Sequence, residues 1–196
     1  PHHENEIAQS EAFTGKKFVN YWFHNEHLLV DGRKMSKSLG NYYTLRDLLT
    51  KNYNPKAIRY LLLSVHYRQQ LNFTEEAVKA EENAVQRLKD FTGRINRISK
   101  SNFTSKESEK NEGIIKNYIK LTKKNFELEM DDDLNISNAL GYLFKFVKDM
   151  YKFISEDKIN YDSANHMLEF IKEINTILGV LDFKEEKLSP EIKKLI

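Results

Sequence analysis

Apolar residues recur every three or four positions after residue 74, and this helical period limits the fold more than any other feature of the sequence. The first stretch extends to about Ser99, and its stripe comprises Ala77, Ala80, Ala84, Leu88, Phe91, Ile95 and Ile98. Three more patterns follow, at about 114–130, along Leu140–Ile154 and along Met167–Ile177. Because a helix must bury its apolar face, the four patterns predict a helical bundle.

Short polar residues mark the starts of three helices. Thr44 precedes LRDLLTKN, Asn54 precedes Pro55 and an apolar run, and Thr74 precedes two glutamates. Thr and Asn side chains accept hydrogen bonds from the first free N–H groups of a helix, and proline is favoured at its first position. We therefore expect a helix after each of the three residues.

The first 43 residues are organised differently. Pro1 to about Ala12 is predicted to be a helix that Thr14 and Gly15 end. The segment Lys17–Phe23 (KFVNYWF) is β-branched and aromatic on both faces, which predicts a strand covered on both sides, with its aromatic rings in a core rather than stacked on a base. LLVDGRKM predicts a hairpin with a two-residue turn at Asp31-Gly32.

Three later segments are polar. Ser99–Gly113 is predicted to be a linker or a connection between helices. The run DDDLN, Asp131–Asn135, could hold a cation, but carboxylates before an apolar helical run favour a helix entrance. Ser189 and Pro190 are expected to begin a last helix.

Composition excludes several classes of protein. There is no cysteine, so the chain has no disulfide framework, and a metal site must use His, Asp or Glu. The net charge of +2 arises from 31 basic and 29 acidic residues, so nucleic-acid binding would need a local patch. No apolar run reaches about 18 residues and the first residues show no signal-peptide pattern, so we expect a cytoplasmic protein without a membrane span. Because the chain begins with Pro1 rather than methionine, we expect a piece of something longer.

The segment DGRKMSKSLGN, 31–41, has no apolar period and suits a mobile loop. Lys34 and Lys37 could close over a triphosphate, where their charge would stabilise developing negative charge. Ser36 and Ser38 could add hydroxyl donors, and Gly40 allows unusual backbone angles. An exposed, inert basic turn is the alternative that the residues leave open.

Two further sets of residues are candidate sites. His2 and Glu6 are four apart, so they share one face of a helix and could bind one metal ion, or they form a solvated helix start. The basic strip, which we define as Lys56, Arg59, His66 and Arg68, suits the phosphates of a folded RNA, or is a solvated face.

Four segments together resemble the cysteinyl-tRNA synthetase family. PHHENEIAQSEAF resembles its zinc-bearing helix, KMSKSLGN its class I signature loop, LLLSVHYRQQLNFTEEAV its helical junction, and MDDDLNISNAL the start of a bundle helix. The resemblance implies a mainly α chain, in which the end of an α/β nucleotide-binding (Rossmann-like) domain with a short β segment precedes an all-α bundle. The implied domains are 1–43 (catalytic end), 44–100 (stem-contact junction) and 101–196 (tRNA-binding bundle), with the long helix 75–99 shared.

In this family, cysteine and ATP, which is used with magnesium, give cysteinyl adenylate, and the cysteine passes to the 3′ end of tRNA(Cys). The resemblance makes Lys37, assisted by Lys34, the group that stabilises the transferring phosphates. His2 and Glu6 become two of four ligands of one zinc, which selects the thiolate, and two upstream cysteines become the others. The family's HIGH-type motif is missing, so this chain alone is not expected to activate cysteine. The family's anticodon-reading region is also expected to be absent or truncated after Ile196. A cytoplasmic monomer is implied.

Two alternatives belong to other classes. A paralogous ligase that joins cysteine to an amino sugar would use the same metal and loop, but it would not need a long RNA-docking bundle. A non-catalytic RNA-binding helical module would be expected to lose residues that serve only chemistry, whereas His2, Glu6, Lys34 and Lys37 are all present.

Overall fold

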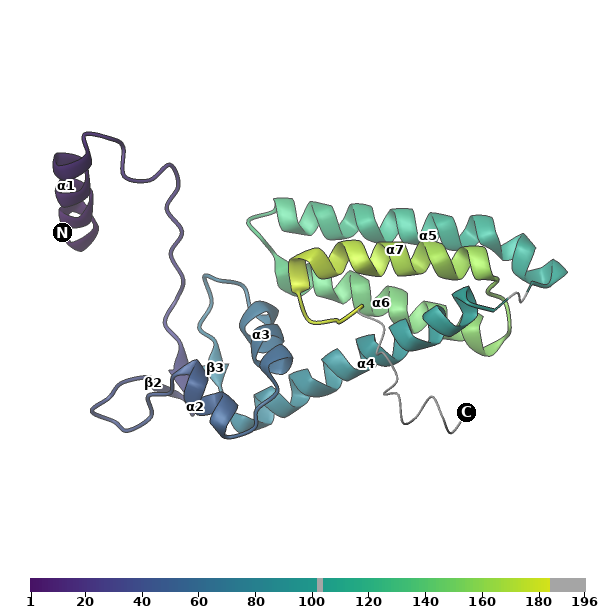
Figure 1. Cartoon of the computed structure of the whole chain (residues 1–196), viewed down its shortest axis with the longest axis horizontal. Coiled ribbons are helices and arrows are strands. Elements are labelled where there is room, and N and C mark those ends of the chain that lie inside the picture. Colours follow the sequence, from purple (N-terminus) through teal and green to yellow (C-terminus); the bar gives the residue numbers. More distant parts are fainter. Residues whose placement is uncertain (102–103, 184–196) are drawn as a thin grey trace, which may run out of the picture.

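The computed structural model describes residues 1–101 and 104–183, and within them the chain is mainly α-helical, as predicted (Figure 1). The helices are α1 (His2–Thr14), α2 (Leu45–Thr50), α3 (Pro55–Ser64), α4 (Glu75–Ser99), α5 (Lys106–Asp131), α6 (Ile136–Ser155) and α7 (Tyr161–Leu178). The strands are β1 (Leu29–Val30), β2 (Arg33–Lys34) and β3 (Asn72–Phe73). The helix predicted after Ser189 lies outside the described residues.

The predicted hairpin is confirmed. β1 and β2 pair antiparallel through Asp31 and Gly32, whose φ angles of 51° and 72° are those of a type I′ turn. The parallel partner β3 was not predicted, and its Asn72 accepts a hydrogen bond from the Gly32 N–H at 2.8 Å. Because β3 leads directly into α4, the loop that follows β2 is anchored beside the start of α4.

The strand predicted at Lys17–Phe23 is wrong, because this segment has no regular structure. Its aromatic side chains lie at the surface: Tyr21 is 92% exposed and Phe23 is 57% exposed. A strand is stable only when another segment pairs with it, and no strand of the described residues pairs with this one. The aromatic composition of this stretch therefore does not decide its conformation here.

Two hydrophobic cores share α3 and α4. The small core contains Val30, Leu48, Ala57, Ile58, Leu61, Phe73 and Val78, and it fixes the sheet against α2 and α3. The large core fills the bundle. Tyr60 of α3 belongs to the large core while its neighbour Leu61 belongs to the small one, and Val78 and Val85 divide α4 in the same way. These two helices therefore join the loop region to the bundle.

The predicted four-helix bundle is confirmed, with α5 packed on α6 and α4 on α7 (Figure 1). Thr44, Asn54 and Thr74 cap α2, α3 and α4 as expected. On α4 the predicted stripe is right from Leu88 onward, but Val78 and Val85 are the buried residues nearer the start, instead of the alanines beside them. Larger aliphatic side chains bury more apolar area, so they turn the helix toward the core.

The linker predicted at Ser99–Gly113 is too long, because α5 already begins at Lys106. Ser105 caps it: its Oγ accepts from the Ser108 N–H at 3.1 Å, and the Ser108 Oγ accepts from the Ser105 N–H at 2.8 Å. A reciprocal pair of this kind satisfies two free N–H groups and starts a helix in a polar sequence. In the part of the chain that the structure describes, no helix has the length and apolar character needed to cross a membrane.

Candidate functional site

The loop between β2 and α2 is closed by one side chain, that of Asn41. The Ser36 N–H donates to Asn41 Oδ1 at 2.9 Å, and Asn41 Nδ2 donates to the Lys34 carbonyl at 3.2 Å. These two bonds tie the beginning of the loop to its end. The loop is therefore a preformed turn, although nearly all of its residues are exposed.

Further hydrogen bonds shape the inside of this turn. The hydroxyls of Ser36 and Ser38 lie 3.2 Å apart, and the Leu39 N–H donates to Ser36 Oγ at 3.3 Å. The Gly40 N–H donates to the Lys37 carbonyl at 3.2 Å, and Gly40 has a φ of 67°, in the region that favours glycine. The geometry thus gives Ser36 and Gly40 a structural part in the loop.

The two loop lysines are available to an anion. Lys34 and Lys37 are exposed, and among the described residues neither ammonium group has a carboxylate partner. Lys37 Nζ lies 5.4 Å from the centre of the Tyr42 ring, a cation–π distance. An exposed lysine held only by this weak contact can leave the ring when a phosphate approaches.

His2 and Glu6 face one another on α1, with 3.4 Å between His2 Nε2 and Glu6 Oε1. Two ligands bonded to one tetrahedral zinc at about 2.0–2.1 Å would lie about 3.4 Å apart, so the pair fits half of a zinc site as well as it fits an ion pair. The described residues contain no cluster of three or more His, Cys, Asp or Glu side chains able to hold a metal. α1 also stands apart from β2 and the loop (Figure 1), so the structure does not bring the two candidate sites together.

Two members of the basic strip, Lys56 and Arg59, are more than a solvated face, because both bind within the chain. Lys56 forms an ion pair with Asp182, and the Arg59 guanidinium donates to the carbonyls of Ile177, at 3.1 Å, and Leu178. The last carbonyls of a helix carry partial negative charge, so a cation stabilises them. These two side chains of α3 therefore hold the end of α7.

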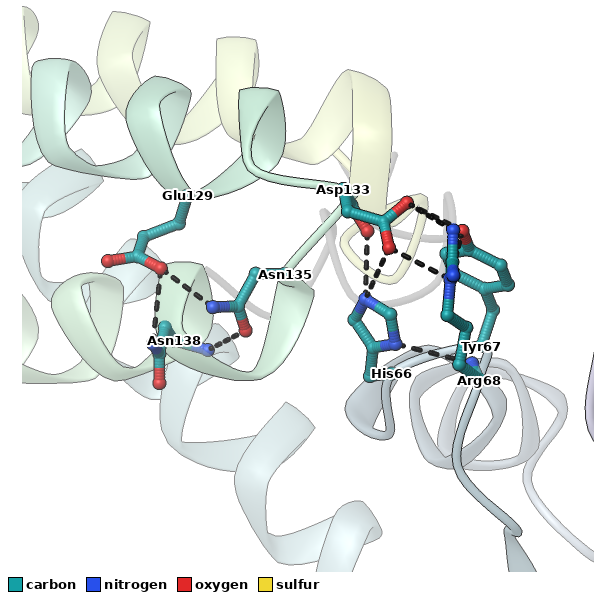
Figure 2. Close-up of polar contacts among 7 residues, drawn as sticks. All are labelled: His66, Tyr67, Arg68, Glu129, Asp133, Asn135 and Asn138. Atoms are coloured by element: carbon teal, nitrogen blue, oxygen red, sulfur yellow. Dashed lines mark hydrogen bonds and ion pairs between the residues drawn. The ribbon is translucent and has the colours of Figure 1, made fainter.

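The rest of the basic strip converges on Asp133, in the turn between α5 and α6 (Figure 2). The Tyr67 hydroxyl donates to Asp133 Oδ1 at 2.6 Å, Arg68 Nε lies 2.9 Å from Asp133 Oδ2, and His66 Nε2 lies 2.8 Å from the Asp133 carbonyl oxygen. We call these four residues the junction cluster. It connects the segment after α3 to the bundle, so the strip is neither free nor merely solvated.

The charges of the junction cluster reinforce one another. The hydrogen bond from Tyr67, with the nearby charges of Arg68 and His66, lowers the pKa of Asp133, and the same Tyr67 hydroxyl and Asp133 raise the pKa of Arg68. Both shifts favour the charged forms, although the groups are exposed and screened by solvent.

The DDDLN run leads into α6, as predicted, but the residue that caps the helix is Asn135 and not one of the carboxylates, which lie at the end of α5 and in the turn that follows it. Asp133 and Leu134 have left-handed φ angles of 52° and 58°. Asn135 caps α6, and its Nδ2 donates to Glu129 Oε2 at 2.8 Å, which fixes the turn from the α5 side (Figure 2). The turn presents Asp133 to the junction cluster.

The junction cluster also reaches the segment that leads back to α1. The rings of Phe23 and Tyr67 lie 4.3 Å apart, and the Glu26 N–H donates to the Tyr67 carbonyl at 2.8 Å. Sequence reasoning missed Tyr67 and Asp133. The available signal was an aromatic residue between two basic ones in a strip otherwise interpreted as solvated.

Two protein families match this chain. Residues 1–83 match the family described as tRNA synthetases class I (C) catalytic domain, and residues 125–182 match the DALR domain. The first range contains α1, the loop and α3, and the second contains the end of α5, the Asp133 turn, α6 and α7. The junction cluster therefore connects the two matched ranges.

Curated relatives include the cysteine–tRNA ligase of Chlamydia felis, which is 45% identical over 100% of this chain and 40% of its own length. The cysteine–tRNA ligase of Brachyspira hyodysenteriae is 48% identical over 91% of this chain and 36% of its own length. The chain thus spans about two fifths of these relatives.

A solved structure supports the fold. The LeuRS of Agrobacterium radiobacter K84, crystallised in a ternary complex with tRNA and LeuAMS, superposes with a TM-score of 0.64 at 15% identity. The match covers 89% of this chain and 23% of that protein. At this identity the likeness concerns the arrangement of the elements alone.

Proposed function

The chain belongs to the cysteine–tRNA ligase family, and from this premise we propose that it is part of an enzyme that activates cysteine with ATP and transfers it to the 3′ end of tRNA(Cys). The observation that carries the proposal is the loop clamped by Asn41. It presents two exposed lysines that lack carboxylate partners among the described residues. A polyphosphate is the substrate that such a pair suits best.

Within this function Lys37 stabilises the phosphates as adenylate forms, and Lys34 assists from the end of β2. Magnesium accompanies the ATP and shares the neutralisation of its charge. Because Asn41 ties the ends of the loop together, the loop can move as one unit when it closes on the nucleotide and opens again. Ser38, Ser36 and Gly40 shape that unit and line the nucleotide.

His2 and Glu6 would hold one zinc together with two ligands from elsewhere in the whole protein. When bound, zinc supplies a soft cation that prefers the thiolate of cysteine to the hydroxyl of serine. The residues of this chain provide one imidazole nitrogen and one carboxylate oxygen at a separation that suits a tetrahedral ion. Replacing His2 with alanine is expected to reduce zinc content, measured by atomic emission, while the control His27→Ala keeps it.

The remaining parts of the proposal concern partners and context. The bundle docks tRNA(Cys), the enzyme is a cytoplasmic monomer, and the domains are 1–43, 44–100 and 101–196 with 75–99 shared. The match of residues 125–182 to the DALR domain supports this ligase over an amino-sugar ligase, which has no use for an RNA-docking bundle.

The test is cysteine-dependent exchange of pyrophosphate into ATP by the whole protein. We expect Lys37→Ala to slow exchange by about 100-fold or more, because it removes a charge that contacts the transition state. Lys51→Ala is the matched control, since Lys51 is another exposed lysine over a tyrosine ring, at 4.4 Å from that of Tyr43, but lies outside the loop. Equal exchange by both variants would refute the role of Lys37, and no cysteine-dependent exchange by the unaltered protein would refute the function.

A further inference from the structure

A shallow hollow of about 390 Å³ lies on the outer face of the bundle, on α4. Its lining comprises Lys89, Asp90, Gly93, Arg94 and Arg97 of α4 and Tyr151 of α6. The hollow lies well away from the loop: Arg94 is 19 residues beyond Glu75, and at about 1.5 Å per residue this is roughly 28 Å along the helix. It is therefore a site separate from the proposed nucleotide site.

Positive charge dominates the hollow, with three cations against one carboxylate. Within residues 1–101 and 104–183, no carboxylate forms an ion pair with Lys89, Arg94 or Arg97. The carboxylate of Asp90 already accepts a hydrogen bond from Gln86 Nε2 at 2.8 Å. The cations thus lack a partner of opposite charge, unlike those of the basic strip, which bind within the chain.

The guanidinium of Arg94 lies over an aromatic ring. Its central carbon lies 5.4 Å from the centre of the Tyr151 ring, which is a cation–π contact between α4 and α6. Such a contact uses the face of the guanidinium and leaves its N–H groups able to donate to an anion. A planar guanidinium can then form two parallel hydrogen bonds to one phosphate.

Gly93 lines the hollow, and its surroundings in the fold do not require a glycine. It lies inside α4, its φ is not positive, and a Cβ built on it would meet nothing within 4 Å. Glycine weakens a helix interior relative to alanine, so its usual justification is the close approach of another group to the backbone. An external ligand that enters the hollow would supply that group.

We propose that this hollow binds backbone phosphates of the tRNA, with Arg94 and Arg97 as the main contacts and Lys89 as a third. This inference rests on the proposed function, which supplies an RNA partner. RNA double helices are recognised mainly through their phosphates and shape, and an arginine-rich helix face with little exposed apolar surface suits that recognition. The cations of the basic strip already contact the end of α7, Asp182 and Asp133, so the hollow offers the more available positive charge.

The first test measures the equilibrium binding of a tRNA(Cys) transcript to the whole protein at several salt concentrations. The double variant Arg94→Ala with Arg97→Ala is expected to bind about ten-fold or more weakly at about 100 mM salt, and to lower the slope of log K against log salt by about two. The matched control is Lys120→Ala with Lys124→Ala on α5, which removes the same charge from another helix and should leave the slope nearly unchanged. Equal affinities and slopes for the two double variants would overturn the proposal.

The second test uses Gly93→Ala. If Gly93 had only a structural role, this variant would change the stability of the helix and not the binding of RNA. Alanine should raise the melting temperature, because it favours the helix, and should also weaken binding of the transcript several-fold, because its methyl group enters the hollow. A higher melting temperature with unchanged RNA binding would overturn the role of Gly93. If the protein binds polyglutamate more tightly than the transcript, and the double arginine variant loses that preference, RNA is not the ligand of the hollow. Pyrophosphate exchange by the unaltered protein needs no RNA, so it tests the proposed function separately.

Discussion

Asn41 is the residue on which the geometry of the lysine loop depends most directly. It accepts from the Ser36 N–H and donates to the Lys34 carbonyl, so one side chain sets the distance between the two ends. We expect Asn41→Ala to reduce cysteine-dependent pyrophosphate exchange about ten-fold, less than Lys37→Ala, because it loosens the loop without removing a charge. Exchange rates measured over a range of ATP concentrations should show this loss. A rate within two-fold of that of the unaltered protein would contradict the proposal that Asn41 sets the geometry of the loop.

Asp133 makes a pH-dependent contribution to stability. Its pKa in the folded protein lies below the ordinary value of 3.8, chiefly because Tyr67 donates to it. A lowered carboxyl pKa means that its contribution is present above about pH 4 and is lost as the pH falls through the lowered value. Asp133→Asn should therefore lower the melting temperature at pH 7, and the difference from the unaltered protein should shrink below pH 4.

Asparagine is the suitable replacement because it tolerates the left-handed φ of 52° at this position, so the turn itself is kept. The neighbouring Asp132→Asn is the control, since Asp132 has no ion pair among the described residues. Melting temperatures of the two variants, measured from pH 2.5 to pH 7, test whether the charge of Asp133 stabilises the folded protein. A constant difference across that range would show that the charge of Asp133 is not what stabilises the junction.

The end of α7 illustrates how one element is fixed by another. Gly179 ends the helix with a φ of 64°, and a Cβ there would lie 2.9 Å from Arg59 Nε, the group that donates to the last carbonyls of α7. Gly179→Ala combines left-handed strain with displacement of Arg59, so we expect the free energy of unfolding to fall by about 2 kcal/mol or more.

Gly15→Ala is the matched control for this element. Gly15 also ends a helix at a φ of 64°, but its Cβ would meet nothing within 4 Å. α1 contains no buried residue, so its loss should change the global free energy of unfolding by less than about 0.5 kcal/mol. Urea unfolding of both variants measures the difference, and equal losses would mean that the contact with Arg59 is irrelevant.

Elements that depend on neighbouring residues could be predicted from the sequence. Thr44, Asn54 and Thr74 cap their helices through bonds to residues two or three positions away, so the local pattern contains the whole cause. Lys17–Phe23 shows the opposite case. A strand needs a partner segment, and β propensity alone supplies none, so an aromatic and β-branched stretch remains exposed coil.

At the scale of the whole molecule, the features that were predicted involve residues close together in the sequence, and the features that were missed involve residues far apart. The lysine loop and the His2–Glu6 pair lie within short segments, and the structure places both as their spacing indicates, although it tests neither role. The contacts of Lys56, Arg59 and Tyr67 involve partners between 66 and 126 positions away. A basic residue has the same appearance in sequence whether it meets phosphate, solvent or a distant carbonyl, so only the fold could assign these contacts.

The two shared helices and the isolated α1 lead to a last prediction about how the chain opens. α1 has 13 residues, none of them buried, whereas α3 has only 10 but buries Ala57, Ile58, Tyr60 and Leu61. An isolated helix of this length is marginal in water, and protection against hydrogen exchange comes from buried packing. In the 196-residue chain we expect amides of α1 to exchange on the timescale of unstructured peptides, while interior amides of α3 and α7 exchange orders of magnitude more slowly. Hydrogen exchange followed by mass spectrometry measures this. Equally slow exchange in α1 and α3 would contradict this prediction. It would show that α1 is protected by packing against another part of the protein, which the contacts of the described residues do not include.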